Sequence, residues 1–336
     1  MKQPRIANVN LGTVCLCVLL VFLGCGDQDD VSTCCADGEP SGLSLSVAKY
    51  PDNKKAGLSI TFDDGCSSVF DKIIPMMNAY NLKGTFYIIA GHVELRNEWA
   101  KWKAVREDGH DIGNHSLTHE HYLGSISDYK ILRKEIDSSF RLIRDRLGKG
   151  PFSFGHPFHS AGPKADKIVF ENHFTTKISP AGFSKLVSLY DLSVCKAEMK
   201  VALRKGEWVV TTAHGVDDKF CYNSLTADFF TKFLDYVTSH SDSIHIDTFE
   251  NLSKYKIEAN DSHLSVERLD DRRFIVKLRN ELPTTVFDYP LTIVVRGLNN
   301  ASERIQPYQH KIDVTPTENG ANVKIPPNGS FIILAE

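Results

Sequence analysis

The sequence lacks a large excess of charge of either sign, since its 336 residues carry a formal net charge of only −3. It also lacks internal repeats and low-complexity segments. Proteins that bind nucleic acid or anionic lipid through charge present a basic surface, which this balance does not indicate. With 42% hydrophobic and 24% charged residues, the composition is that of a globular protein with a sizeable core. We expect one large and one small domain, and no nucleic-acid partner.

Long hydrophobic runs are scarce as well. The run near the N-terminus, from Val14 to Leu23, is too short to span a bilayer comfortably. Lys2 and Arg5 precede this run and small residues follow it, a pattern typical of a secretory signal. We therefore expect a signal peptide at residues 1–24 and an exported protein.

The end of that run, Phe22-Leu23-Gly24-Cys25, resembles a bacterial lipobox, in which the cysteine is lipidated and becomes the first mature residue. Three aspartates follow closely and resemble the acidic tracts that route some bacterial lipoproteins to the cell surface: Asp27, Asp29 and Asp30. We expect a cell-envelope lipoprotein, periplasmic or on the cell surface, with Cys25 as its lipid anchor in the outer membrane. The alternative is a cleaved signal that releases a soluble secreted protein.

The eight cysteines show no paired C-x-x-C pattern of the kind that holds a structural metal. Two of them fall in the leader, and export permits the remaining six to form disulfides. Cys195 with Cys221 is a plausible bridge, although the spacing alone leaves the connectivity open.

Strands and helices alternate through the first two thirds of the chain. After a tether at residues 25–45, which is rich in Asp, Ser, Gly and Cys, short apolar runs alternate with amphipathic stretches from 46 to 256. We expect strands at 58–62, 85–89 and 208–212, and helices at 67–80, 98–107, 127–147 and 226–238. This alternation indicates a parallel α/β arrangement, either open or closed into a barrel.

The pattern changes after residue 256. Five short β-like runs, at 264–266, 274–278, 291–295, 323–325 and 331–334, are separated by clusters of Asn, Pro, Gly and Asp, without a helical period. We expect residues 257–336 to form a small all-β sandwich. Its aromatic residues are scattered, which favours a packing or spacing role over carbohydrate binding.

Two adjacent carboxylates end the first predicted strand. In Thr61-Phe62-Asp63-Asp64-Gly65, the apolar run gives way to Asp63 and Asp64, and Gly65 lets the chain turn. Ligands of parallel α/β folds are held at the carboxyl ends of strands, and neighbouring side chains on an extended segment point in different directions. One aspartate is therefore a candidate metal ligand and the other a candidate base. The alternative is a turn that caps the next helix.

Two histidines four residues apart, His115 and His119, follow another β-like segment. On a helical turn two such imidazoles share one face and can converge on one cation. Two histidines and one carboxylate leave positions open for water, which is the arrangement of a hydrolytic metal site. Two surface histidines on a helix are the plainer alternative.

Together, the Asp63-Asp64-Gly65 strand end and the later His115-Ser116-Leu117-Thr118-His119 resemble the first two motifs of the polysaccharide deacetylases, carbohydrate esterase family 4, with a NodB-type domain. The resemblance covers residues 46–256. It implies a distorted (β/α) barrel with the site at the carboxyl ends of its strands. It further implies that Asp63 is the general base and that Asp64, His115 and His119 are the metal ligands.

The last motif of the family, a strand followed by a histidine that acts as general acid, is matched by Trp208 to His214. The third motif departs from the family, because Gly155-His156-Pro157-Phe158 has glycine in place of the arginine that orients the catalytic aspartate. By this alignment Phe158 offers its backbone N–H to the oxyanion, beside Pro157. We hypothesise that His156 or His159 positions Asp63 or the substrate instead; the alternative is that both histidines only line the wall of the groove. The aspartate of the fourth motif has only Asp191 as a candidate, on position alone.

The resemblance implies a hydrolase that removes acetyl groups from a glycan with a divalent metal, Zn²⁺ being favoured over Co²⁺, Ni²⁺ or Mn²⁺. An N-acetylhexosamine glycan is the favoured substrate, since an amine leaves poorly unless it is protonated, and His214 would supply that proton. The first alternative is an O-acetyl esterase on a xylan-type polysaccharide. The second is a catalytically weakened lipoprotein that binds glycans, which the missing arginine favours and Asp63 and His214 oppose.

Overall fold

The computed structural model describes residues 42–178 and 184–335. The predicted signal peptide and the lipidation site at Cys25 lie outside these residues. Within the described residues no helix is both long and apolar enough to cross a membrane. Contacts divide the chain into two compact units, and the described part of the first comprises residues 61–178, 184–188 and 212–227. The described part of the second comprises residues 42–60, 189–211 and 228–335.

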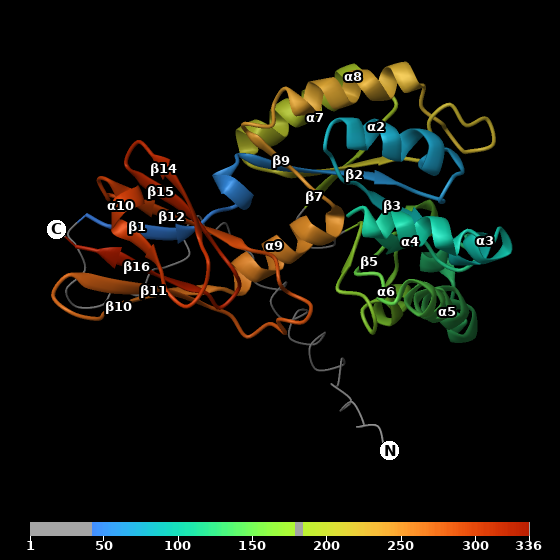
Figure 1. Cartoon of the computed structure of the whole chain (residues 1–336). Helices are drawn as coiled ribbons and strands as arrows, with labels where there is room; N and C mark the ends of the chain where they lie inside the picture. Colours follow the sequence, from blue (N-terminus) through green and yellow to red (C-terminus); the bar gives the residue numbers. More distant parts are fainter. Residues whose placement is uncertain (1–41, 179–183, 336) are drawn as a thin grey trace, which may run out of the picture. The chain divides into compact units, whose positions relative to one another are not determined.

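A sheet of eight strands organises the first two thirds of the chain (Figure 1). Its strands, in chain order, are β2 (Ala56–Phe62), β3 (Thr85–Ile88), β4 (Asp111–Asn114), β5 (Ser153–Phe154), β6 (Thr175–Thr176), β7 (Ser184–Ser188), β8 (Trp208–Ala213) and β9 (Ile244–Ile246). They are arranged as β6-β5-β4-β3-β2-β8-β7, with β9 also paired to β2. The pairings of β2 with β3 and β9, and those from β3 to β6, are parallel. The expected parallel α/β arrangement is confirmed, and among the described strands the order ends at β6 and β7, so the sheet is open.

The helices alternate with these strands, as the sequence predicts. They are η2 (Val69–Ile73) continued by α2 (Ile74–Ala79), α3 (Ala90–Leu95), α4 (Trp99–Glu107), α5 (Tyr129–Leu147), α6 (Pro163–Val169), α7 (Leu192–Lys205), α8 (Ala227–Thr238) and α9 (Phe249–Asp261). Short 3₁₀ turns occur at η1 (Pro51–Asn53), η3 (Leu123–Ser125) and η4 (Pro157–His159). The four helices predicted from periodicity are confirmed within two residues at each end.

Helix α5 shows how local sequence sets these bounds. The Asp128 carboxylate accepts a hydrogen bond from the Lys130 N–H and caps the first turn. Gly148 ends the helix with a φ of 79°, a left-handed conformation that costs glycine little. Between these ends the buried face carries Leu132, Ile136 and Ile143 at helical spacing. The helix therefore presents a regular apolar stripe, and its residue Glu135 reaches the loop that follows β4.

The C-terminal segment forms two antiparallel sheets of four strands each. One has the order β1-β12-β15-β14, the other β10-β11-β16-β13. The bounds are β1 (Ser44–Val47), β10 (His263–Arg268), β11 (Arg273–Arg279), β12 (Leu291–Arg296), β13 (Ile305–Pro307), β14 (Asp313–Thr317), β15 (Gly320–Ile325) and β16 (Ser330–Leu334), with the short helix α10 (Ala301–Arg304) between β12 and β13. Residues from both sheets, among them Val276, Ile293 and Phe331, share one buried core. This is the sandwich-like arrangement that alternating apolar residues predict.

Two features of this region differ from a simple division of the chain at residue 256. Strand β1 lies early in the chain, yet it pairs with β12, with Leu45 opposite Val295. Helix α9 runs from Phe249 to Asp261 without a break. The boundaries 46–256 and 257–336 therefore stay predictions, while the sandwich takes its first strand from the start of the described chain.

Candidate metal centre and its surroundings

Asp63 and Asp64 follow β2 directly, at the edge of the sheet where parallel strands end. Phe62, the last residue of the strand, is 1% exposed, and the Asp63 N–H donates to the Ala213 carbonyl at the end of β8. Asp64 has a φ of 70° and Gly65 a φ of 64°, so the backbone turns sharply at the aspartates. The strand ends at Phe62, so the two carboxylates are separated by this left-handed turn and not by the alternation of an extended strand.

His115 and His119 are brought together by a loop, so the helical turn expected from their spacing is wrong. His115 follows β4 directly, and Ser116 and His119 have φ values of 69° and 60°. Side chains replace the hydrogen bonds of a helix. The Asn114 Oδ1 accepts the Ser116 N–H, and the Ser116 hydroxyl accepts the His119 N–H.

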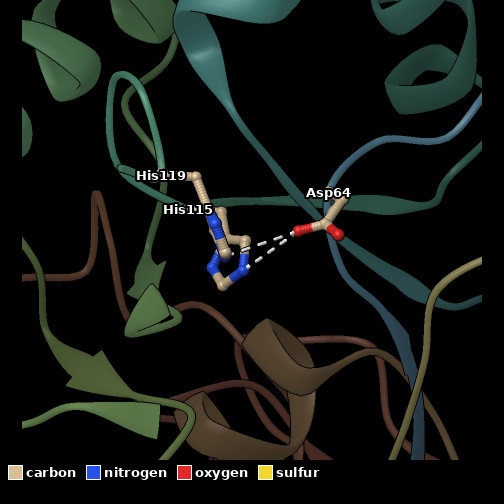
Figure 2. Close-up of side chains that lie close together, drawn as sticks. All are labelled: Asp64, His115 and His119. Carbon is tan, nitrogen blue, oxygen red and sulfur yellow. Dashed lines mark ion pairs between the residues drawn. The ribbon is translucent and has the colours of Figure 1, made fainter. Parts of the chain in front are cut away.

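The three predicted ligands converge (Figure 2). The Nε2 atoms of His115 and His119 lie 3.5 Å and 3.6 Å from Oδ1 of Asp64. One possible ligand atom from each of the three residues lies within 4.8 Å of the other two. His115 Nδ1 is 2.7 Å from the Gly155 carbonyl, to which a neutral imidazole donates its N–H, leaving Nε2 as the acceptor. Burial lowers the pKa of His115 to about 3, so the ring is neutral at neutral pH.

This donor set fits a divalent cation. The Asp64 Oδ1 atom is buried and has no hydrogen-bond partner, which is costly for a carboxylate unless a cation neutralises it. Burial also raises the pKa of Asp64, and a bound cation would reverse that effect. Two imidazole nitrogens and one carboxylate oxygen are the ligands of catalytic zinc sites. The residues predicted to hold a metal therefore meet in a geometry and chemistry suited to one.

The Asp63 carboxylate is held by a residue that sequence reasoning missed. Lys177, which follows β6, places its Nζ 2.7 Å and 2.8 Å from the two Asp63 oxygens and 2.7 Å from Oγ1 of Thr212. Burial raises the pKa of a carboxyl group, but the Lys177 ammonium, together with His115 and His214, outweighs that effect and holds the pKa of Asp63 below its usual range. Asp63 is therefore ionised, as a general base must be.

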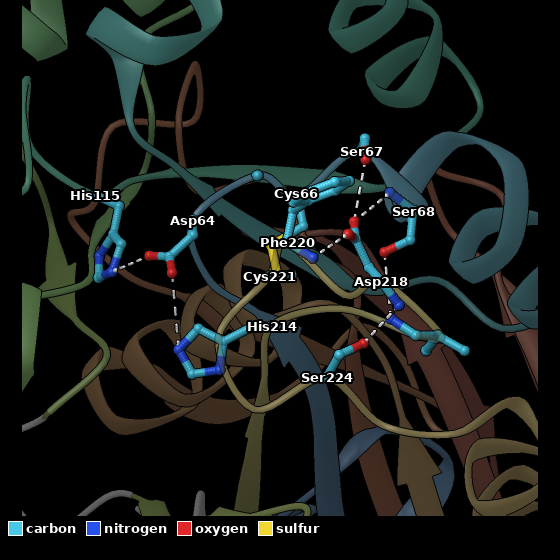
Figure 3. Close-up of a disulfide and its surroundings, with 12 residues drawn as sticks. Asp64, Cys66, Ser67, Ser68, His115, His214, Asp218, Phe220, Cys221 and Ser224 are labelled. Atoms are coloured by element: carbon cyan, nitrogen blue, oxygen red, sulfur yellow. Dashed lines mark hydrogen bonds and ion pairs between the residues drawn. A yellow bond between two sulfur atoms is a disulfide. The ribbon is translucent and has the colours of Figure 1, made fainter.

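His214 lies on the other side of Asp64. It follows β8, and its Nε2 is 4.0 Å from Oδ2 of Asp64 (Figure 3). Its ring meets the ring of Tyr222 edge-on, with centroids 5.1 Å apart. The structure thus brings the residue expected to act as general acid next to a candidate metal ligand that precedes it by 150 residues in the chain.

A disulfide joins the segment after Asp64 to the loop after His214. Cys66 bonds to Cys221, while Cys195 is free and buried, so the suggested bridge between Cys195 and Cys221 is wrong. Asp218 strengthens the same link, because its carboxylate accepts from the Ser67 hydroxyl and from the Ser68 N–H (Figure 3). The segments that carry the expected base and acid are therefore tied together covalently and by hydrogen bonds.

The residues of the third motif, which differs from the family pattern, lie near the site, but their contacts differ from those expected. His156 Nε2 is 2.8 Å from the Asp166 carboxylate, and the Asp63 carboxylate contacts Lys177 and Thr212. This corrects the hypothesis that His156 positions Asp63. Pro157 is buried, and Phe158 has a φ of 55° in the turn that follows it. Asp191, the weak candidate for the fourth motif, caps helix α7 by accepting the Ser193 and Val194 N–H groups.

Steric crowding around position 155 explains why glycine occupies it. A Cβ atom there would lie 2.9 Å from the Tyr87 ring and 3.2 Å from Nδ1 of His115. Any larger side chain at this position, arginine included, would therefore require the tyrosine or the candidate ligand to shift.

Exposed aromatic side chains surround the candidate ligands. A cavity of about 430 Å³ beside Asp64 and His119 is lined by Phe220 and Tyr222, which are 90% and 74% exposed. Against His119, the ring of Phe158 lies with its centroid 4.5 Å away, and Phe158 in turn stacks on Tyr122 at 4.4 Å. Large exposed aromatic rings beside a polar cavity mark a binding surface rather than a core.

A buried histidine supports the loop that carries the two candidate ligands. His173 Nε2 is 3.1 Å from Nδ2 of Asn114, and its Nδ1 is 3.0 Å from the Val169 carbonyl. Since the amide donates and the carbonyl accepts, these contacts suit a neutral imidazole. Burial lowers the pKa of His173 to about 4.

This shift predicts a loss of stability in mild acid. Between pH 6.5 and about 4 the unfolded chain binds a proton at His173 that the folded chain does not, so stability falls as the pH falls, by up to ~1.4 kcal/mol per pH unit from this residue. We expect His173→Asn to lose less thermal stability between pH 7 and pH 5 than the parent protein, with both measured in the presence of a chelator. His310→Asn, at an exposed histidine, is the control. Equal losses in all three proteins would contradict the assignment.

Comparisons with known proteins place this site in context. Residues 50–175 match the family model described as polysaccharide deacetylase. A gellan lyase from a Bacillus species is 23% identical over 283 residues, which are 74% of this chain and 11% of that protein. A peptidoglycan-N-acetylglucosamine deacetylase from Bacillus cereus is 34% identical over 120 residues, 35% of this chain and 53% of that protein.

Among solved structures, the carbohydrate esterase domain of a multidomain xylanase from the hindgut metagenome of Trinervitermes trinervoides aligns with a TM-score of 0.43 and 18% identity. The alignment covers 60% of this chain and 91% of that one. The present chain spans from about a tenth to about half of the length of the two curated relatives. The matched segment 50–175 contains Asp63, Asp64, His115 and His119, whereas Lys177 and His214 lie beyond it.

Proposed function

We propose that this protein is a metal-dependent hydrolase that removes acetyl groups from a polysaccharide or oligosaccharide, because residues 50–175 match the polysaccharide deacetylase family model. The observation that carries the proposal is the convergence of Asp64, His115 and His119 beside an ionised Asp63. Asp64, His115 and His119 would hold the metal, and the preference for Zn²⁺ follows from the mixed nitrogen and oxygen ligands.

When bound, a divalent cation at this site supplies Lewis-acid chemistry, which polarises a carbonyl oxygen and makes water easier to deprotonate. The chain supplies the rest. Asp63 accepts the proton of the attacking water, since Lys177 keeps its carboxylate ionised. The Phe158 N–H donates to the oxygen on which negative charge develops. His214 donates a proton to the departing nitrogen or oxygen, from its place next to Asp64.

A glycan substrate agrees with the surface around the site. The apolar face of a sugar ring packs against an aromatic ring, and exposed aromatics lie on either side of the candidate ligands: Tyr222 next to His214, and Phe158 next to His119. The cavity is open and polar as well as aromatic, which suits a chain of sugar units better than a small apolar ligand. We favour N-acetylhexosamine units because a departing amine needs a proton more than a departing ester oxygen does, and His214 is the candidate donor.

Export is part of the proposal. The disulfide between Cys66 and Cys221 would persist in an oxidising compartment, in agreement with the secretory signal expected at residues 1–24. We propose that the protein works in the cell envelope or outside the cell, where acetylated polysaccharides occur, with Cys25 as a lipid anchor.

The test is acetate release by purified, metal-replete protein from a panel of acetylated glycans. We expect release from N-acetylglucosamine oligomers to exceed release from acetylated xylan. The reverse order would favour the O-acetyl esterase. Saturable binding of a glycan together with metal content, and without acetate release from any substrate, would favour the weakened glycan-binding protein.

A further inference from the structure

We propose that Lys177 is a positioning residue that holds Asp63 in its catalytic orientation, so that a lysine after β6 supplies the cation beside the base. The inference rests on the proposed deacetylase function and adds to it a residue outside the matched family segment. It is carried by the contacts of the lysine ammonium, its burial and the space around it.

The ammonium of Lys177 uses its three N–H groups on two partners. Two point at the Asp63 oxygens, at 2.7 Å and 2.8 Å, and the third at the hydroxyl of Thr212, at 2.7 Å. That hydroxyl in turn lies 3.2 Å from Oδ2 of Asp63. Both oxygens of the base are therefore fixed by the same small network, and charge-assisted hydrogen bonds of this kind are short and directional.

The network is enclosed. The Lys177 side chain is 1% exposed and that of Asp63 is 5% exposed. The lysine Nζ also lies 5.1 Å from the centroid of the Tyr87 ring. Removing a long charged side chain from water is costly, and its pairing with the buried Asp63 carboxylate must offset that cost. Enclosure also removes the alternative positions that a surface lysine would sample, so the carboxylate has one orientation.

The contacts around position 155 indicate why the cation beside Asp63 comes from the segment after β6 and not from the segment after β5. Position 155, on the neighbouring chain segment after β5, is crowded by the Tyr87 ring and by His115. The same tyrosine that fills this space lies against Lys177. His156, the other basic side chain of that segment, is turned to Asp166. Among the described residues near the base, Lys177 is thus the cation with direct contact to both Asp63 oxygens.

A buried ion pair could serve stability alone, and a double-mutant cycle separates the two roles. We expect Lys177→Met to lower kcat for acetate release by about 10²-fold, because a small displacement of a catalytic group costs that much, with KM and metal affinity changed less than about threefold. In an Asp63→Asn background, Lys177→Met should lower kcat by less than about threefold, since the lysine acts only through Asp63. Lys167→Met, at an exposed lysine of α6, is the matched control and should match the parent protein.

The possible results distinguish a failure of the positioning role from a failure of the proposed function. Parent-like kcat in Lys177→Met, or equal losses with and without Asp63, would overturn the positioning role while the parent's acetate release keeps the proposed function. No acetate release by the parent would overturn the function itself. If Lys177→Met does not fold, Thr212→Val removes the hydroxyl shared by Lys177 and Asp63. We then expect a fall in kcat of about tenfold at unchanged KM, and an unchanged kcat would reject the proposal.

Discussion

Asp63→Asn is expected to lower kcat for acetate release by about 10²- to 10⁴-fold, the usual contribution of a general base. An amide cannot accept the proton of the attacking water at neutral pH, although its shape is close to that of the carboxylate. The candidate ligands Asp64, His115 and His119 are unchanged, so we expect metal content to stay the same. The measurement is steady-state kinetics on an acetylated oligosaccharide, with metal content determined on the same preparation.

The control for this experiment is Asp71→Asn, at an exposed aspartate of η2, which should leave kcat unchanged. Asp63→Asn also leaves the Lys177 ammonium buried without its carboxylate partner, which lowers stability. Thermal unfolding of the variant must therefore be measured beside its kinetics. A folded variant that contains metal and keeps more than a tenth of the parent kcat would remove Asp63 from the role of base.

Removal of the metal is expected to abolish acetate release, with a loss of about 10³-fold or more, because Lewis-acid stabilisation is worth several kcal/mol and each 1.4 kcal/mol is a factor of ten. Chelation followed by stoichiometric Zn²⁺ should restore the parent protein. Asp64→Ala removes the buried Oδ1 atom that lies 3.5 Å and 3.6 Å from the two imidazole Nε2 atoms, so this variant should neither retain the metal nor be restored by it.

The chelated parent protein and the Asp64→Ala variant also define the results that would contradict the metal site. If the chelated parent protein retains full activity after dialysis, with less than one metal ion per ten chains, the hydrolysis does not depend on a metal. If Asp64→Ala binds Zn²⁺ with parent affinity, the ligand set is different from the one proposed here.

Short motifs made part of the site predictable. Asp63 and Asp64 are neighbours at the end of an apolar strand, and His115 and His119 are four residues apart, so a local pattern contains both pairs. That they meet followed from the rule that parallel strands end at one edge of a sheet. The backbone between the histidines did not follow, because the spacing of four also suits a helix. The side chains of Asn114 and Ser116 decide that the segment is a loop.

Long-range partners were beyond such patterns. Lys177 meets Asp63 across 114 residues, and it follows a strand of two residues, too short to show a period. Cys66 meets Cys221 across 155 residues, and six cysteines allow many pairings. Strand β1 pairs with β12 in the same way, since an alternating pattern predicts a strand but not its neighbour. In each case the missing information is tertiary.

The most direct measurement is anomalous diffraction at the zinc absorption edge from crystals of the metal-replete protein. The account predicts one strong peak within about 2.0–2.2 Å of an Asp64 oxygen and of the Nε2 atoms of His115 and His119. A peak at this position, in a structure in which the Asp63 carboxylate is still paired to Lys177, would support both the proposed metal site and the proposed base. A protein saturated with zinc that shows no peak between these three side chains would contradict it.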